Sequence, residues 1–140
     1  MEGTNINFHS ECSFLLKDST SVINWLGGVS TSEGKKIGQL NYIFCDDSYL
    51  HKINLEFLKH DTYTDIITFD DSLGDELIAD IYISIERVEE NASIYSVSFQ
   101  NELYRVIVHG LLHLCGYTDK TDQALDQMRG KEDKYLAVLL

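Results

Sequence analysis

Residues 99–119 read FQNELYRVIVHGLLHLCGYTD, and this stretch decides the fold that we expect. Apolar side chains cover most of a helical circumference over residues 99–114, which is typical of a helix buried at the centre of a domain. Gly116 follows where such a helix would end, and glycine adopts the left-handed turn that ends many helices without a steric penalty. The stretch therefore predicts a central buried helix and a chain that then folds back toward it.

Two histidines share one face of this predicted helix. His109 and His113 are four residues apart, about one helical turn, so both imidazoles can reach one metal ion. The returning chain can present Asp119 as a third ligand, and two histidines with one carboxylate leave a coordination position for water, as in catalytic metal sites. The alternative is a pair of histidines held only by hydrogen bonds. Because imidazoles without partners are costly in so apolar a helix, the pattern favours the metal.

The rest of the sequence predicts strands and helices packed around this helix. Strands are expected at residues 6–8, 39–45, 65–69 and 76–85, and further helices at 18–26, 46–58, 86–95 and 121–139. Gly27 and Gly28 are expected to stop the first of these helices, and a polar loop to follow from Ser30 to Lys36. This order predicts one α+β domain over residues 1–140, with a single mixed β-sheet of about four strands surrounded by helices and the metal site on the central helix.

The charge of the chain excludes one class of partner. The formal net charge is −12, and residues 61–140 contain sixteen acidic but only six basic side chains. Non-specific binding to DNA needs a basic face, so we expect no DNA partner. No apolar run approaches the roughly 20 residues of a membrane span, and the first residues lack the pattern of a signal peptide. Together with three scattered cysteines (Cys12, Cys45 and Cys115), these features predict a cytoplasmic protein with no membrane partner.

The histidine spacing also occurs in metzincin-type metalloproteases, in which a glutamate follows the first histidine and acts as the general base. Here that position is Gly110, which carries no carboxyl group, so the sequence disfavours a protease. Hydrolysis itself stays possible, because a metal ion can lower the pKa of its own water. We can name no catalytic general base from the sequence.

Two motifs make the chain similar to the YbeY family of metal-dependent endoribonucleases, which take part in rRNA maturation. The family signature H-G-x-L-H-L-x-G-Y matches residues 109–117, and D-x-P-T-[DN]-V-L-S-F resembles DTYTDIITF at residues 61–69, which Leu73-Gly74-Asp75 follows. The order and spacing of the motifs agree over roughly residues 54–136, more than half of the chain. Two separate motifs in the right order make the resemblance specific.

The resemblance implies a single-strand-specific endoribonuclease of rRNA maturation and ribosome quality control, in which metal-activated water attacks the phosphodiester. It implies rRNA and the ribosome or ribosomal proteins as partners, and one divalent metal per chain, most simply zinc. The ligands carried over are His109, His113 and, where the family usually has a third histidine, Asp119. A carboxylate is an acceptable zinc ligand, but it makes the site less positive by one charge.

Other candidate residues lie around the second motif. The resemblance implies a basic residue just before this motif, but that position is Leu58 here. Lys59 and His60 are therefore the nearest cations for a substrate phosphate. The alternative for both is that they lie at a solvated helix end. Asp65 can bond the backbone of its loop or be a neighbour of the site, and we favour the first; we expect the acidic turn at residues 70–76 to face away from the site.

Two other functions stay open at this stage. The first is a ribosome-assembly or interaction protein with a mainly structural metal, which the strong negative charge supports. A metal held by four protein ligands would favour it, because such a site has no open position. The second is a metal-dependent hydrolase of another substrate, such as a peptide, which the missing glutamate at Gly110 makes less favourable.

Overall fold

Over the residues that the structure describes, nine elements follow one another in the order expected. They are seen in a computed structural model, which describes residues 5–58 and 64–139. Their bounds are β1 (Ile6–Ser10), α1 (Ser19–Ser32), β2 (Lys36–Cys45), α2 (Asp47–Leu58), β3 (Ile66–Asp70), β4 (Glu76–Ser84), α3 (Ile85–Ile94), α4 (Phe99–Leu114) and α5 (Asp122–Leu139). None of the helices in these ranges is long and apolar enough to cross a membrane.

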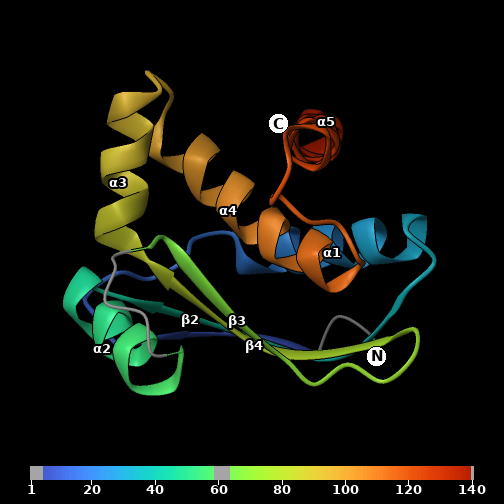
Figure 1. Ribbon diagram of the computed structural model, residues 1–140, viewed down its shortest axis with the longest axis horizontal. Coiled ribbons are helices and arrows are strands. Elements are labelled where there is room, and N and C mark those ends of the chain that lie inside the picture. The colour runs from blue at the N-terminus through green and yellow to red at the C-terminus, as the bar shows by residue number, and fades with distance from the viewer. Residues whose placement is uncertain (1–4, 59–63, 140) are drawn as a thin grey trace.

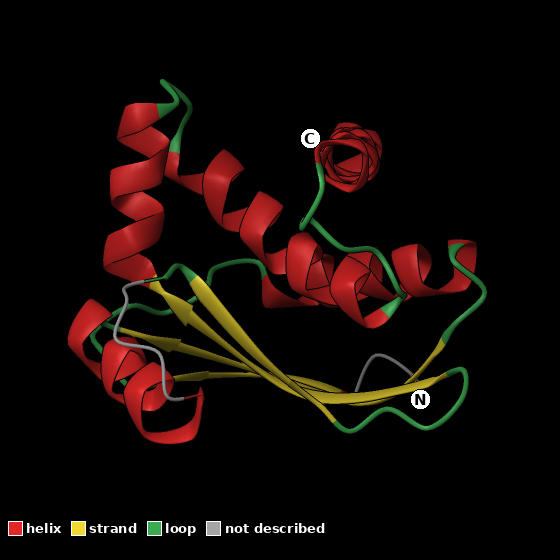
Figure 2. Ribbon diagram, viewed as in Figure 1, coloured by secondary structure: helices red, strands yellow, loops and turns green. Residues whose placement is uncertain are grey.

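The strands form one mixed sheet in the order β1-β2-β4-β3. The pairs β1–β2 and β2–β4 are parallel, whereas β3 pairs with β4 in the antiparallel direction and lies at one edge. Helices α1 and α4 lie over one face of the sheet with α5 beyond them, and α2 lies on the other face at one end (Figures 1 and 2). This arrangement confirms the predicted α+β fold with a four-stranded mixed sheet.

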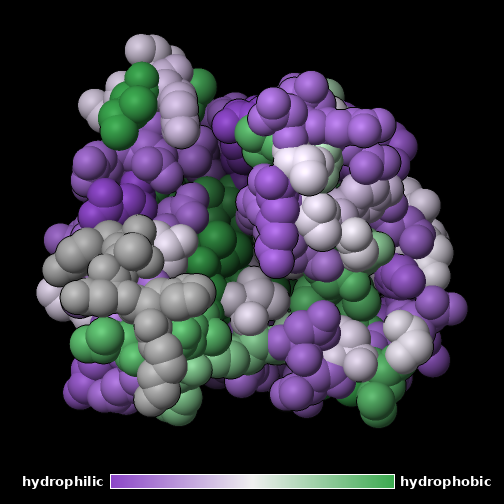
Figure 3. Space-filling view, viewed as in Figure 1, coloured by the Kyte–Doolittle hydropathy of each residue, from purple (hydrophilic) through white to green (hydrophobic). Residues whose placement is uncertain are grey.

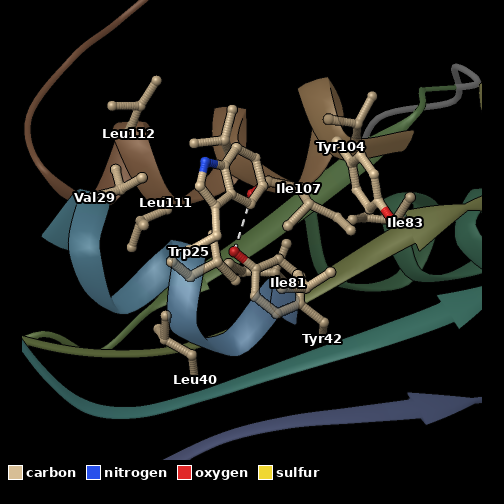
Figure 4. Close-up of a cluster of buried hydrophobic side chains, with 14 of the residues drawn as sticks. Trp25, Val29, Leu40, Tyr42, Ile81, Ile83, Tyr104, Ile107, Leu111 and Leu112 are labelled. Atoms are coloured by element: carbon tan, nitrogen blue, oxygen red, sulfur yellow. Dashed lines mark hydrogen bonds between the residues drawn. The ribbon is translucent and has the colours of Figure 1, made fainter. Parts of the chain in front are cut away.

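Helix α4 is the centre of the main core, as its apolar circumference predicted. Its residues Ile107 and Leu111 are fully buried and pack with Trp25 of α1 and with the inward side chains of β2 and β4 (Figure 4). Burial of a large apolar side chain contributes about 1.5–3 kcal/mol, so this layer supplies much of the stability. The phenol of Tyr42 is satisfied inside the core, because it donates to the carbonyl of Ile107 at 3.0 Å.

Local signals set both ends of α4 and the start of α5. The side chain of Ser98 caps α4 by accepting from the amide of Asn101 at 3.0 Å. Gly116 takes φ +107°, the left-handed conformation expected after the helix. Thr121 then caps α5 by accepting from the amide of Ala124 at 3.0 Å. The loop between these helices is therefore held at both ends.

The predicted end of the first helix was wrong. Helix α1 continues through Gly27 and Gly28 to Ser32, and the chain reverses at Gly34, where φ is +73°. A helical glycine costs about 1 kcal/mol relative to alanine, but the turn beyond the pair buries Val29 in the core, which offsets this cost. The expected polar loop is correspondingly short, because β2 already begins at Lys36.

Glycine at position 110 lets α4 approach the sheet closely. A Cβ atom there would lie 3.1 Å from Cδ1 of Ile66 and 3.2 Å from Cγ2 of Ile81, which is closer than ordinary packing. The position after the first histidine therefore points at β3 and β4. A glutamate base of the metzincin kind has no room there.

Candidate metal centre

His109, His113 and Asp119 converge at the C-terminal end of α4. The two imidazole rings are 4.6 Å apart between centroids and lie at 84° to each other. After Gly116 the chain folds back, and Oδ2 of Asp119 lies 3.5 Å from Nε2 of His109 and 3.7 Å from Nε2 of His113. Two ligands at about 2.0–2.1 Å from a tetrahedral metal are themselves about 3.3 Å apart. The two nitrogens and one oxygen therefore fit one ion.

The cluster is open on one side. The side chain of His109 is 18% exposed, whereas His113 and Asp119 are 32% and 38% exposed. Among the residues that the structure describes, no fourth His, Cys, Asp or Glu joins the group, whose ligand atoms all lie within 4.8 Å of one another. Three protein ligands with solvent access resemble a catalytic site more than a closed structural one.

A buried carboxylate on α5 orients His109. Oε2 of Glu132 lies 2.7 Å from Nδ1 of His109, which leaves Nε2 to face Asp119. Glu132 is only 4% exposed, and its other oxygen accepts from Arg105 at 2.9 Å. Arg105 in turn donates to Asp133 at 2.7 Å. Histidines that bind metals commonly give their second ring nitrogen to a carboxylate in this way, which fixes the ring and its tautomer.

The two histidines differ in basicity because their neighbours differ. Burial alone would lower the pKa of His109, but the hydrogen bond and negative charge of Glu132 outweigh it and raise the pKa above its ordinary value. The pKa of His113 is lowered, first by burial and then by the positive charge of His109. At neutral pH, His113 therefore offers a free nitrogen more readily than His109 does.

Sequence reasoning did not single out Glu132 or Arg105. Glu132 lies 23 residues beyond His109, so no local motif joins them. A signal was nevertheless present, because Glu132 is spaced with Met128 and Leu136 on the apolar face of α5. A carboxylate on such a face needs a partner in the core.

An acidic cleft of about 370 Å³ lies beside the cluster, between α3, α4 and α5. Figure 3 shows this hollow near the centre of the view, with hydrophobic surface at its floor and hydrophilic surface of α3 and α5 on either side. Its polar lining consists of Asp65, Asn91, Glu102, Arg105, His109, Asp119, Arg129, Glu132 and Asp133. Burial raises the pKa of both Asp65 and Glu102. Asp65, which we expected to bond its own loop, accepts from Asn91 of α3 at 3.4 Å and lies in the same cleft as His109.

A second hollow, the β3 groove, has a volume of about 650 Å³ and begins at His113. Its lining comes from α2, from β3 and from the end of α4 with the loop beyond, and consists of Asn54, Leu58, Thr64, Ile66, Ile67, Thr68, Asp70, His113, Leu114 and Lys120. The expectation that the acidic turn faces away from the site was wrong for Asp70, because β3 carries this residue into the groove. Lys59 and His60, the predicted substrate-binding residues, lie outside the described residues.

Cys115 is not a ligand, although it follows the histidine helix directly. It is a free, partly buried cysteine that packs against the main core. Burial raises the pKa of its thiol to about 11, so the thiolate that metals bind is disfavoured. Cys115 is therefore a small residue at the edge of the core.

The comparisons with known proteins agree with the two motifs. A family model described as Endoribonuclease YbeY matches residues 8–139. Endoribonuclease YbeY of Flavobacterium johnsoniae is 53% identical over 95% of this chain and 96% of its own length, and that of Flavobacterium psychrophilum is 56% identical over 94% of each. The solution structure of TM1509 from Thermotoga maritima superposes with a TM-score of 0.67 at 28% identity, covering 96% of this chain and 88% of that one. The chain therefore belongs to the YbeY family of endoribonucleases.

Proposed function

We propose that this chain is a metal-dependent endoribonuclease that cleaves single-stranded rRNA in the cytoplasm during rRNA maturation. The ribosome or ribosomal proteins are its partners in this proposal. His109, His113 and Asp119 bind one divalent metal, most simply zinc. The observation that carries the proposal is the convergence of their three ligand atoms within 4.8 Å at an open site. Membership of an endoribonuclease family supports RNA as the substrate.

Each residue of the site has a distinct part in this proposal. When bound, a divalent metal supplies Lewis-acid chemistry, which lowers the pKa of water and stabilises negative charge on a phosphate. Glu132 holds the ring of His109 so that Nε2 faces the ion. Asp119 supplies an oxygen ligand that removes one positive charge from the site. Two nitrogens and one oxygen suit zinc, and they also suit other first-row metals.

Removal of the metal tests this function on the wild-type protein. We expect elemental analysis to find about one divalent ion per chain, and a chelator that removes it to abolish cleavage of a single-stranded RNA. Adding zinc back should restore the cleavage, and a duplex of the same sequence should stay intact. Cleavage that continues after elemental analysis shows the metal to be gone would contradict a catalytic metal. A metal-loaded protein that cleaves no RNA would support the assembly or interaction protein instead.

The charges around the site favour one route for the RNA strand. Among the described residues, the acidic cleft carries five carboxylates (Asp65, Glu102, Asp119, Glu132 and Asp133) against two arginines, Arg129 and Arg105, and Arg105 is already paired with two of the carboxylates. Within the described part of its lining, the β3 groove carries a single carboxylate, Asp70, together with the exposed Lys120. Since phosphates need cations and avoid carboxylates, the strand lies in the β3 groove. The edge strand β3 and the hydroxyls of Thr64 and Thr68 offer further hydrogen-bonding groups to it.

Two exposed cations on opposite sides of the site test this route. We expect Lys120→Gln to weaken binding of a labelled single-stranded RNA about three- to tenfold and to reduce the salt dependence by about 0.7 in slope, the value for one lost phosphate contact. Arg129→Gln removes the same charge from the acidic cleft and is expected to change the affinity less than twofold. Fluorescence anisotropy at several salt concentrations measures both. The opposite ranking of the two variants would place the strand in the acidic cleft.

A further inference from the structure

A buried carboxylate at the end of α1 joins three separate parts of the chain. The side chain of Glu33 is only 8% exposed. It accepts from the hydroxyl of Tyr117 at 2.7 Å, from the ammonium of Lys131 at 3.1 Å and from the hydroxyl of Tyr135. These donors lie 84 to 102 residues away along the chain. The four residues are called the Glu33 cluster below.

The carboxylate of Glu33 is charged and fully partnered. Burial alone would raise its pKa, but the hydrogen bonds from Tyr135, Tyr117 and Lys131 outweigh burial and lower the pKa below its ordinary value. Lys131 also lies 5.5 Å from the centre of the Tyr117 ring, so the cation contacts two members of the cluster. A buried charge persists only where its partners compensate for lost water, and these three donors do so.

The donors of the cluster come from the two segments that contact His109. Tyr117 lies in the loop that carries Asp119, and its hydroxyl attaches this exposed loop to α1. Lys131 is next to Glu132 on α5, and Tyr135 lies almost one turn further along. The loop supplies the oxygen that faces Nε2 of His109, and α5 supplies the oxygen at Nδ1.

We propose that Glu33 is a positioning residue for the metal centre. Its charged carboxylate holds the loop and α5 together, so that Asp119 lies beside Nε2 of His109 and Glu132 beside Nδ1. Trp25, on the same helix, supports α5 by donating to the carbonyl of Tyr135 at 2.9 Å. The inference rests on the proposed metal function, and a measurement of metal affinity tests it directly.

The test measures the zinc affinity of the purified full chain by competition with a chromophoric chelator. Glu33→Gln keeps the shape of the side chain but removes its charge, and we expect it to weaken zinc binding about tenfold. The control is Asp47→Asn, which removes a carboxylate bonded to Arg87 at 2.7 Å and to Ser84 at 3.3 Å, in a different part of the molecule. It should leave the zinc affinity unchanged even where it lowers Tm.

Tyr117→Phe gives a milder second variant and closes a double-mutant cycle. Alone it should weaken zinc binding several-fold, and in the Glu33→Gln background it should add little, because the two residues act through one hydrogen bond. Lower Tm with an unchanged zinc affinity in both single variants would make the cluster merely structural and overturn the inference. A wild-type chain that binds no divalent metal would reject the proposed function at the first measurement, and the positioning role with it.

Discussion

His113→Ala is expected to abolish retention of the metal and to lower cleavage of single-stranded RNA roughly a thousandfold, because a site with three protein ligands keeps only two. His113 is the better choice for this test than His109. Its side chain is 32% exposed, and its loss leaves no buried carboxylate without a partner, whereas loss of His109 would deprive Glu132 of one. Elemental analysis and a single-turnover cleavage assay measure the two effects.

The matched control for this variant is His9→Ala, which removes an exposed histidine from β1. It should retain the metal and the full rate of cleavage. The thermal unfolding of metal-free His113→Ala should resemble that of metal-free wild type, since alanine is favourable in a helix. If His113→Ala still binds one metal per chain and cleaves at the wild-type rate, the ligand assignment is wrong.

Glu132→Gln is expected to weaken metal binding about 10- to 100-fold near neutral pH, because the carboxylate that orients His109 is lost. The variant should, however, keep its remaining metal affinity to a lower pH than the wild type does. Glu132 raises the pKa of His109, so in the wild type protons compete with the metal as the pH falls through that raised value. Without the carboxylate the pKa of His109 falls, and the loss of affinity at acid pH should begin at a lower pH. Zinc titrations at a series of pH values measure both effects.

Asp133→Asn serves as the comparison for this variant. Asp133 binds the same Arg105 at 2.7 Å, but it is 66% exposed and does not contact His109. Exposed ion pairs contribute little, so neither the affinity nor its pH dependence should change. Identical zinc affinities for Glu132→Gln and the wild type at every pH would show that Glu132 does not act through His109.

The parts of the molecule that short-range patterns control could be predicted from the sequence. Helix α4 begins and ends at the expected residues, because Ser98, the apolar stripe and Gly116 all act locally. Gly27 and Gly28 misled the prediction of α1, because the burial of Val29 depends on tertiary packing. The convergence of His109, His113 and Asp119 follows from one helical turn and one reversal of the chain. Contacts such as Glu132 with His109 or Glu33 with Tyr117 join distant segments, and no local spacing encodes them.

The close approach of α4 to the sheet has a consequence for the width of the proposed RNA channel. Ile66 is in contact distance of the missing side chain at Gly110, and the same residue lines the β3 groove. A methyl group at position 110 would need the space that Ile66 occupies. Either the side chain of Ile66 would then move into the groove, or α4 would move away from the sheet. The width of the proposed channel and the distance between the histidine helix and the sheet are thus set together, by the absence of a side chain at position 110.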